Sequence, residues 1–314
     1  MFVGIVSGIL WGLDTVILGV ALAMSPFATT EQAIFLAPFV STFLHDAFSA
    51  LWMLIYMAAK KELGKVVKAF KTKSGKWIVL GALIGGPIGM SGYVAAIKYI
   101  GPGYTAIISA LFPAFGVLLA YIFLKEKMTL IQGIGLAVSI AGVIVLSYTS
   151  ESAVPENMVI GVICAVACSL AWAAEAVICA HGMKDPDVSD EQALQIRQLT
   201  SSIFYGLIIL PILSGVGMAI SLVPTKTAAI IVLAALFGTA SYVLYYRAIN
   251  KIGPGKAMAL NITYIAWSIV FALILLKEIP SAKSIICGIV IIGGSLVAAN
   301  GIQGLLKKED EVNE

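Results

Sequence analysis

Residues 96–103 read AIKYIGPG, and residues 248–255 read AINKIGPG. The two stretches lie 152 positions apart, and the same offset relates three further matches: Leu124-Lys125-Glu126 with Leu276-Lys277-Glu278, Tyr93 with Tyr245, and His45 with Arg197. A second offset, 161, relates Trp11 to Trp172 and Asp14 to Glu175. The offset changes if the loop before the second helix differs in length between two copies. The sequence therefore predicts a duplicated chain, with halves at 1–150 and 151–304 and a charged cytoplasmic tail at 305–314.

Composition indicates a membrane protein. Hydrophobic residues make up 60% of the chain and charged residues 12%, whereas a soluble domain carries about 25% charged residues. A helix needs about 20 apolar residues to cross a bilayer. Ten such stretches are present, at 3–24, 32–58, 77–99, 103–124, 129–149, 158–181, 190–214, 226–250, 254–276 and 282–303. The predicted fold class is an all-α integral membrane protein with ten transmembrane helices.

The number of helices in each half fixes how the halves are related. Five is odd, so the second copy must enter the membrane upside down relative to the first. Inverted repeats are typical of secondary transporters, which hold their substrate near the mid-plane of the bilayer at the repeat interface. The sequence therefore predicts two inverted five-helix repeats.

The placement of lysine and arginine predicts the orientation, because cytoplasmic loops carry an excess of these residues. With the N-terminus inside, cytoplasmic segments hold fifteen of the twenty basic residues, seven of them within 60–76. External loops hold Lys98, Lys226, Lys277 and Lys283, and Arg197 lies inside a span. We expect a multi-pass protein of the cell inner (plasma) membrane with both termini cytoplasmic.

Each half carries a tryptophan and an acid three residues apart inside a span, Trp11 with Asp14 and Trp172 with Glu175. This spacing projects both side chains from one face of a helix. A carboxylate in hydrocarbon is by default a functional-site hypothesis, and an acid beside an aromatic ring suits a desolvated organic cation. The two pairs predict a cation site between the halves.

Further side chains can face the same space. The candidates are the rings of Tyr93, Tyr242, Tyr245, Tyr264 and Trp267, with Asn261 as a polar donor. Packing or contact with lipid is the plainer interpretation of any one tyrosine, since aromatic residues are common in spans. Three tryptophans deep in their spans, together with two acids, favour a binding site.

Five ionisable residues within the spans are candidates for proton coupling or gating: Asp14, His45, Asp46, Glu175 and Arg197. Asp46 and Arg197 can instead form an ordinary ion pair between the halves, because an unpaired charge in the membrane is costly. The functional alternative makes His45 and Asp46 part of a proton path or gate.

Glycine and proline predict where helices stop. The stretch Gly85-Gly86-Pro87-Ile88-Gly89 is expected to interrupt the third helix, since proline removes a backbone donor and glycine frees the backbone dihedrals. A broken helix is tolerated in a bilayer where it lines a cavity, and a packing kink is the alternative. The Gly-Pro-Gly sequences at 101–103 and 253–255 are expected to be tight connections between helices.

Taken together, these residues resemble the drug/metabolite transporter superfamily, particularly its EamA-type members. Several strings are similar to the LicB-type bacterial choline transporters: SGILWG at 7–12, GPIGM at 86–90, AWAAE at 171–175, IRQLTS at 196–201 and YIAW at 264–267. The resemblance implies that choline is held in an aromatic box with one acid and is coupled to protons. It gives that role to Trp11, Tyr93, Trp172, Glu175, Tyr242, Tyr245, Tyr264 and Trp267. The acid at Asp14 is not part of the resemblance.

The predicted function is secondary active transport of choline or a similar quaternary ammonium compound by alternating access. Glu175 is the expected main counter-ion, the proton motive force the expected energy source, and no cofactor or metal is expected. An EamA-type exporter of amino acids or other small metabolites stays open as the alternative, with polar recognition by Arg197, Gln198, Asn261 and Thr263. An intramembrane enzyme is disfavoured, because the chain has no paired Gly-x-Gly-Asp and no His-Glu-x-x-His motif. The expected partners are a small organic cation and the lipid bilayer, not nucleic acid, and both a monomer and a homodimer are open.

Overall fold

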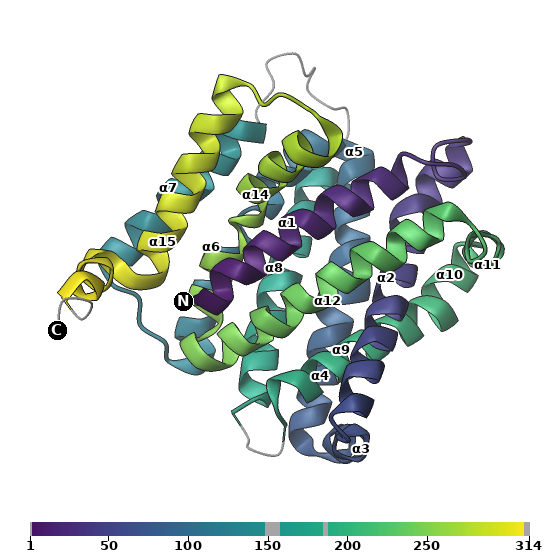
Figure 1. Ribbon diagram of the computed structural model, residues 1–314, viewed down its shortest axis with the longest axis horizontal. Coiled ribbons are helices and arrows are strands. Elements are labelled where there is room, and N and C mark those ends of the chain that lie inside the picture. Colours follow the sequence, from purple (N-terminus) through teal and green to yellow (C-terminus); the bar gives the residue numbers. More distant parts are fainter. Residues whose placement is uncertain (1, 148–157, 185–187, 311–314) are drawn as a thin grey trace.

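The computed structural model describes residues 2–147, 158–184 and 188–310, and the regular elements within these ranges are all helices, with no β-strand among them (Figure 1). The expected boundary between the halves at 150/151 and the last residues of the tail, 311–314, lie outside the described residues. The helices are α1 (Phe2–Leu22), α2 (Glu31–Ala59), α3 (Leu63–Lys71), α4 (Lys73–Leu83), α5 (Met90–Ser109), α6 (Phe112–Leu119), α7 (Leu130–Ser147), α8 (Met158–Gly182), α9 (Asp190–Phe204), α10 (Leu210–Ile212), α11 (Val216–Leu222), α12 (Lys226–Ile252), α13 (Pro254–Asn261), α14 (Tyr264–Phe271) and α15 (Ala282–Asp310).

Four π-helical turns extend these helices: η1 (Ile84–Gly89), η2 (Ala120–Leu124), η3 (Tyr205–Ile209) and η4 (Ala272–Leu276). Among the described residues, eight helical segments are long and apolar enough to cross a membrane. They match eight of the ten expected spans. The other two expected spans match shorter apolar helices, Phe112–Leu124 and Leu130–Leu146.

Local sequence explains where several helices begin. The hydroxyl oxygens of Thr30, Thr72 and Thr225 accept hydrogen bonds from backbone N–H groups in the first turns of α2, α4 and α12. Ser189 caps α9 in the same way, and the Gln192 side chain accepts from the Ser189 backbone N–H, which completes a capping box. Such caps satisfy donors that a helix leaves without partners at its first turn.

Two expectations about breaks were wrong. Gly85–Gly89 does not interrupt the third span, because the chain stays helical there as the π turn η1. Gly101–Gly103 is not a connection either, since α5 continues through it to Ser109. Two expected spans are broken, at equivalent places. Ala110 and Leu111 separate α5 from α6 in the fourth, and Ile262 and Thr263 separate α13 from α14 in the ninth. At 253–255 the expected connection is present, and Gly253 has a φ of 85°, which favours glycine.

Contacts between helices join the two halves. Helix α1 packs against α12 and α14, and α8 packs against α5 and α6. In addition, α2 packs against α9, and α7 lies beside α15 at one edge of the molecule (Figure 1). Both halves therefore contribute to the centre of the protein.

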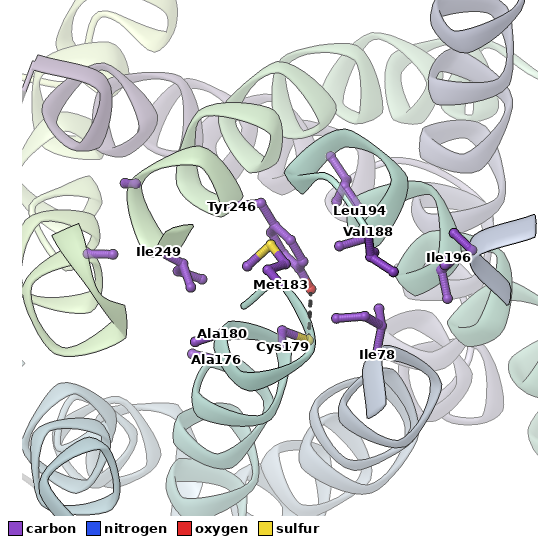
Figure 2. Close-up of a cluster of buried hydrophobic side chains, with 14 of the residues drawn as sticks. Ile78, Ala176, Cys179, Ala180, Met183, Val188, Leu194, Ile196, Tyr246 and Ile249 are labelled. Carbon is purple, nitrogen blue, oxygen red and sulfur yellow. Dashed lines mark hydrogen bonds between the residues drawn. The ribbon is translucent and has the colours of Figure 1, made fainter. Parts of the chain in front are cut away.

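Two clusters of buried apolar side chains enclose that centre. The first contains Met53 and Met57 from the C-terminal part of α2, with Cys179, Ala180, Tyr246 and Ile249 (Figure 2). The second contains Leu36, Val40 and Leu44 from the N-terminal part of α2, with Tyr205 and Leu222. The polar residues His45 and Asp46 lie between these two stretches of α2. The centre of the molecule is thus a polar layer between two apolar ones.

Candidate functional site

A cavity of about 190 Å³ occupies this polar layer. Its walls come from α1, α2, η1, α5, α6, α8, α9, α12, α13 and α14, so both halves line it. Of the residues expected to bind substrate, seven line it: Trp11, Trp172, Glu175, Tyr242, Tyr245, Asn261 and Tyr264. All five candidates for proton coupling line it as well: Asp14, His45, Asp46, Glu175 and Arg197.

The other two expected binding residues lie behind the wall. The ring of Tyr93 stacks against Trp172, with centroids 5.4 Å apart. Trp267 packs over Gly12 of α1, and its indole N–H is buried without a hydrogen-bond partner among the described residues. Tyr93 can therefore orient a wall residue, and Trp267 fills the contact between α14 and α1.

The rings form two groups, one around each tryptophan. Trp11 makes edge-to-face contacts with Tyr242 at 4.7 Å and with Tyr264 at 6.2 Å between centroids. Trp172 has Phe112 at 6.3 Å, nearly perpendicular, and Tyr93 on another side. Edge-to-face packing of this kind stabilises the orientation of each ring. The cavity is thus bordered by two aromatic groups, and each group combines rings from both halves.

The five ionisable side chains form one continuous chain of contacts in which acids and bases alternate. Asp14 Oδ1 lies 3.1 Å from His45 Nε2, and His45 Nδ1 lies 3.8 Å from Asp46 Oδ1. Arg197 Nη1 donates to Asp46 at 3.1 Å, and Arg197 Nε donates to Glu175 at 2.8 Å. Each member is at most 9% exposed. The ion pair between Asp46 and Arg197 is therefore present, and Arg197 also holds Glu175.

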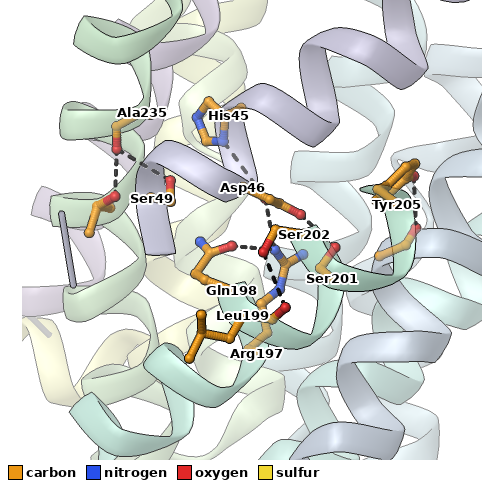
Figure 3. A network of polar contacts seen from close by, with 12 residues as sticks. His45, Asp46, Ser49, Arg197, Gln198, Leu199, Ser201, Ser202, Tyr205 and Ala235 are labelled. Atoms are coloured by element: carbon orange, nitrogen blue, oxygen red, sulfur yellow. Dashed lines mark hydrogen bonds and ion pairs between the residues drawn. The ribbon is translucent and has the colours of Figure 1, made fainter. Parts of the chain in front are cut away.

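Neutral groups complete this chain (Figure 3). Ser201 donates to Asp46 Oδ2 at 2.5 Å, and the Gln198 carbonyl oxygen accepts from Arg197 Nη1 at 2.8 Å. The Arg197 guanidinium also lies over the ring of Tyr242, 5.1 Å from its centroid. Arg197 thus already has the surroundings that suit an organic cation, with carboxylates at its edge and an aromatic face beside it.

Glycines on neighbouring helices make room for these side chains. A methyl group on Gly85 of η1 would overlap the Glu175 carboxylate. One on Gly238 of α12 would lie 2.7 Å from His45 Nε2 and 3.1 Å from Asp14 Oδ2, and one on Gly89 would lie 2.9 Å from the Trp172 ring. The π turn of η1 brings Gly85 and Gly89 to α8, so the glycine-rich stretch shapes the cavity without breaking the helix.

Sequence reasoning missed some residues of the site. Phe112 and Tyr246 line the cavity, and Ser201 binds Asp46. The spacing of Tyr242, Tyr245 and Tyr246 does predict that the three rings share one face of the eighth span, although Tyr246 was not counted among the binding residues. Phe112 offered no such signal, because its place depends on how α6 packs against α8. No group of three or more His, Cys, Asp or Glu residues within the described ranges could hold a metal ion.

Comparison with known proteins agrees with this architecture. Protein LicB of Haemophilus influenzae (strain ATCC 51907 / DSM 11121 / KW20 / Rd) is 38% identical over 202 residues. The match covers 63% of this chain and 66% of that protein, just under two thirds of its length. A solved crystal structure superposes with a TM-score of 0.68 over 99% of this chain and 98% of its own, at 19% identity. At that identity the likeness shows the fold alone.

A protein-family model described as the EamA-like transporter family matches residues 1–148 and again residues 159–300. The two matches together cover nearly the whole chain. They coincide with the two halves that contribute to the central cavity. The chain is therefore a multi-pass membrane protein that belongs to the EamA-like transporter family, within the drug/metabolite transporter superfamily.

Proposed function

We propose that this transporter moves choline or a similar quaternary ammonium ion across the cell inner membrane by alternating access, coupled to protons. The observation that carries the proposal is the lining of one buried cavity by aromatic rings from both halves and by three carboxylates, against one guanidinium and one imidazole. The group therefore keeps a net negative charge whether or not His45 is protonated. Such a cavity attracts a cation that cannot form ordinary hydrogen bonds, because ring faces replace its water.

The ion pairs that Arg197 forms limit which acids can act as counter-ions for the substrate. Glu175 was expected to be a counter-ion for the substrate, yet it accepts from Arg197. One guanidinium cannot neutralise Glu175, Asp46 and Asp14 together, so the negative charge persists. The same pairing disfavours the alternative, an exporter of amino acids, because Arg197 already binds two carboxylates and is not free for the carboxylate of a substrate.

The arrangement of helices supports alternating access through inverted repeats. Exchanging the halves maps the contact of α1 with α12 onto that of α8 with α5, and the contact of α1 with α14 onto that of α8 with α6. The contacts of α2 with α9 and of α7 with α15 map onto themselves. The excess of basic residues in one set of loops supports cytoplasmic termini. Substrate sites at such repeat interfaces are reached from each side in turn.

A binding titration tests the substrate. Purified protein should bind choline, and Trp11→Ala or Trp172→Ala should weaken binding about tenfold to thirtyfold, since a desolvated cation–π contact contributes about 2 kcal/mol. Trp77→Ala is the matched control, because Trp77 contacts His181 and does not line the cavity. Unchanged affinity in both cavity variants, or tighter binding of amino acids than of choline, would contradict the proposal.

Transport into proteoliposomes tests the coupling. Uptake of labelled choline should respond to an imposed pH gradient in the absence of other ion gradients. Uptake that is insensitive to the pH gradient would remove the proton from the mechanism and leave a choline carrier driven by its own gradient or by membrane potential.

A further inference from the structure

The two ends of the chain of charges are repeat equivalents. The offset of 161 relates Asp14 to Glu175, and the offset of 152 relates His45 to Arg197 and Asp46 to Gln198. In the structure each acid pairs with the base of its own half, Asp14 with His45 at 3.1 Å and Glu175 with Arg197 at 2.8 Å. The cavity therefore contains two equivalent acid–base pairs that differ in the base.

The difference in base matters chemically. A guanidinium stays protonated in proteins, whereas an imidazole gains and loses its proton. The Glu175–Arg197 pair is therefore held at zero net charge while both groups are ionised. The Asp14–His45 pair changes from zero to −1 when the imidazole proton leaves. Only this second pair can present a carboxylate without a fixed partner.

Aromatic surroundings are available at the same end. Trp11 precedes Asp14 by three residues on α1, and Tyr242 and Tyr264 pack around Trp11. Arg197 donates directly to Glu175 at 2.8 Å, whereas the base paired with Asp14 is His45. A substrate cation therefore meets a fixed positive charge at Glu175 and a removable one at Asp14. Gly238 of α12 contributes no side chain beside Asp14 Oδ2, and an added methyl group would lie 3.1 Å from that oxygen.

The other groups around His45 do not perform the same role. Asp46, on its own helix, is held by Ser201 and Arg197. Arg197 from α9 keeps a fixed charge, and Tyr242 from α12, which lines the same cavity, is a phenol. Asp14 from α1 is the carboxylate in direct contact with His45 Nε2. A change in the protonation of His45 is therefore felt first at Asp14.

We infer that the substrate cation binds at Asp14, between Trp11 and its neighbouring rings, and that its binding releases the proton of His45 to water. The pair is neutral before the exchange, as carboxylate with imidazolium, and neutral after it, as carboxylate with substrate cation beside neutral imidazole. One cation enters and one proton leaves, so charge balances. This inference rests on the proposed cation transport and places its charge at Asp14 instead of Glu175.

Two double variants with equal net charge test the placement. Asp14→Asn with His45→Gln removes one pair, and Glu175→Gln with Arg197→Gln removes its repeat equivalent. Choline is titrated into each purified full-length protein in weak buffer, and the proton released is measured with an indicator dye. The first variant should bind at least about tenfold more weakly and release no proton. The second should lose about threefold at most and still release close to one proton per choline.

Two outcomes overturn the inference in distinguishable ways. The opposite ranking of the variants would return the counter-ion to Glu175 and leave choline binding intact. Absence of choline binding by the unaltered protein would overturn both the inference and the proposed substrate.

The single variant His45→Gln decides the proton step if the second double variant does not fold. Glutamine still donates to Asp14 but carries no exchangeable charge. Choline affinity of the unaltered protein should rise with pH, by up to about tenfold per unit where His45 is protonated, and affinity of His45→Gln should not depend on pH. Proton release that persists in His45→Gln would overturn the inference.

Discussion

At the scale of single residues, the site depends on places where a side chain is missing. Glu175, His45 and Trp172 each lie over a glycine of a neighbouring helix, namely Gly85, Gly238 and Gly89. Small residues let transmembrane helices approach closely, and here they also admit a charged or aromatic group between two backbones. The glycines are therefore part of the site, although they carry no chemistry themselves.

Gly85→Ala tests this role. The added methyl group would overlap the Glu175 carboxylate, so Glu175 must move away from Arg197. We expect a loss of about 1–3 kcal/mol of stability, the usual cost of overpacking, measured as a lower melting temperature in detergent. Gly19→Ala is the control, because no atom of a neighbour lies within 4 Å of the added group. Equal melting temperatures for the two variants would contradict the idea that Gly85 makes room for the Glu175 side chain.

The sequence predicts which residues belong to the site better than it predicts which side chains they contact. The spacing of Trp11 and Asp14 follows from one helix, so it could be recognised directly. His45 and Asp14 are 31 positions apart, and their contact depends on the packing of α1, α2 and α12 around Gly238. Glu175 could equally have faced an empty cavity, and only the packing of α9 against α2, α4 and α12 brings Arg197 to it. The Asp46–Arg197 pair was the one that the sequence offered as an alternative. The pairs of Asp14 with His45 and of Glu175 with Arg197 are tertiary contacts that spacing did not give.

At the scale of helices, equivalent stretches of the two halves adopt the same local backbone geometry. Ala120–Leu124 and Ala272–Leu276, related by the offset of 152, are both π turns. Each ends at a left-handed lysine, Lys125 or Lys277, with φ of 61°. The same offset relates the break at Ala110 and Leu111, between α5 and α6, to a second break between α13 and α14. The break at Ile262 and Thr263 could still not be predicted from its residues, because neither is a helix breaker. It lies between Asn261 and Tyr264, both in the cavity wall, and so reflects packing around the site.

The close contact between α7 and α15 should depend on a glycine at the helix interface. A methyl group on Gly294 would lie 2.6 Å from the Ser139 backbone nitrogen and 2.7 Å from the Gly135 carbonyl oxygen. Backbone cannot yield as a flexible side chain does, so Gly294→Ala should separate the helices and lower stability by about 1–3 kcal/mol. Thermal unfolding in detergent measures this change. The adjacent Gly293→Ala is the matched control, since its methyl group would meet no atom within 4 Å. A control that is equally destabilised would assign the effect to α15 itself and not to its contact with α7.

At the scale of the whole molecule, the two halves share a plan but not a conformation. The chain bends at Gly253 before α13, whereas α5 runs without a bend through Gly101–Gly103. Glu126 lies against Gly253 and accepts from the Gly255 backbone N–H, so it joins the first half to the second. Its repeat equivalent, Glu278, is exposed. An alternating-access cycle would exchange these two arrangements between the halves.

Neutralising Glu126 tests how this contact stabilises the observed arrangement. Burial raises the pKa of Glu126 above its ordinary value of 4.5. A carboxyl whose pKa is raised on folding binds its proton more tightly in the folded state. It therefore lowers stability above that raised pKa, and the cost disappears as the pH falls below 4.5.

Glu126→Gln keeps an oxygen for Gly255 and removes the charge. It should therefore melt at a higher temperature than the unaltered protein near neutral pH and at the same temperature near pH 4. Glu278→Gln should match the unaltered protein at both. A lower melting temperature of Glu126→Gln near neutral pH would mean that the negative charge, and not the hydrogen bond alone, holds the two halves together at Gly253.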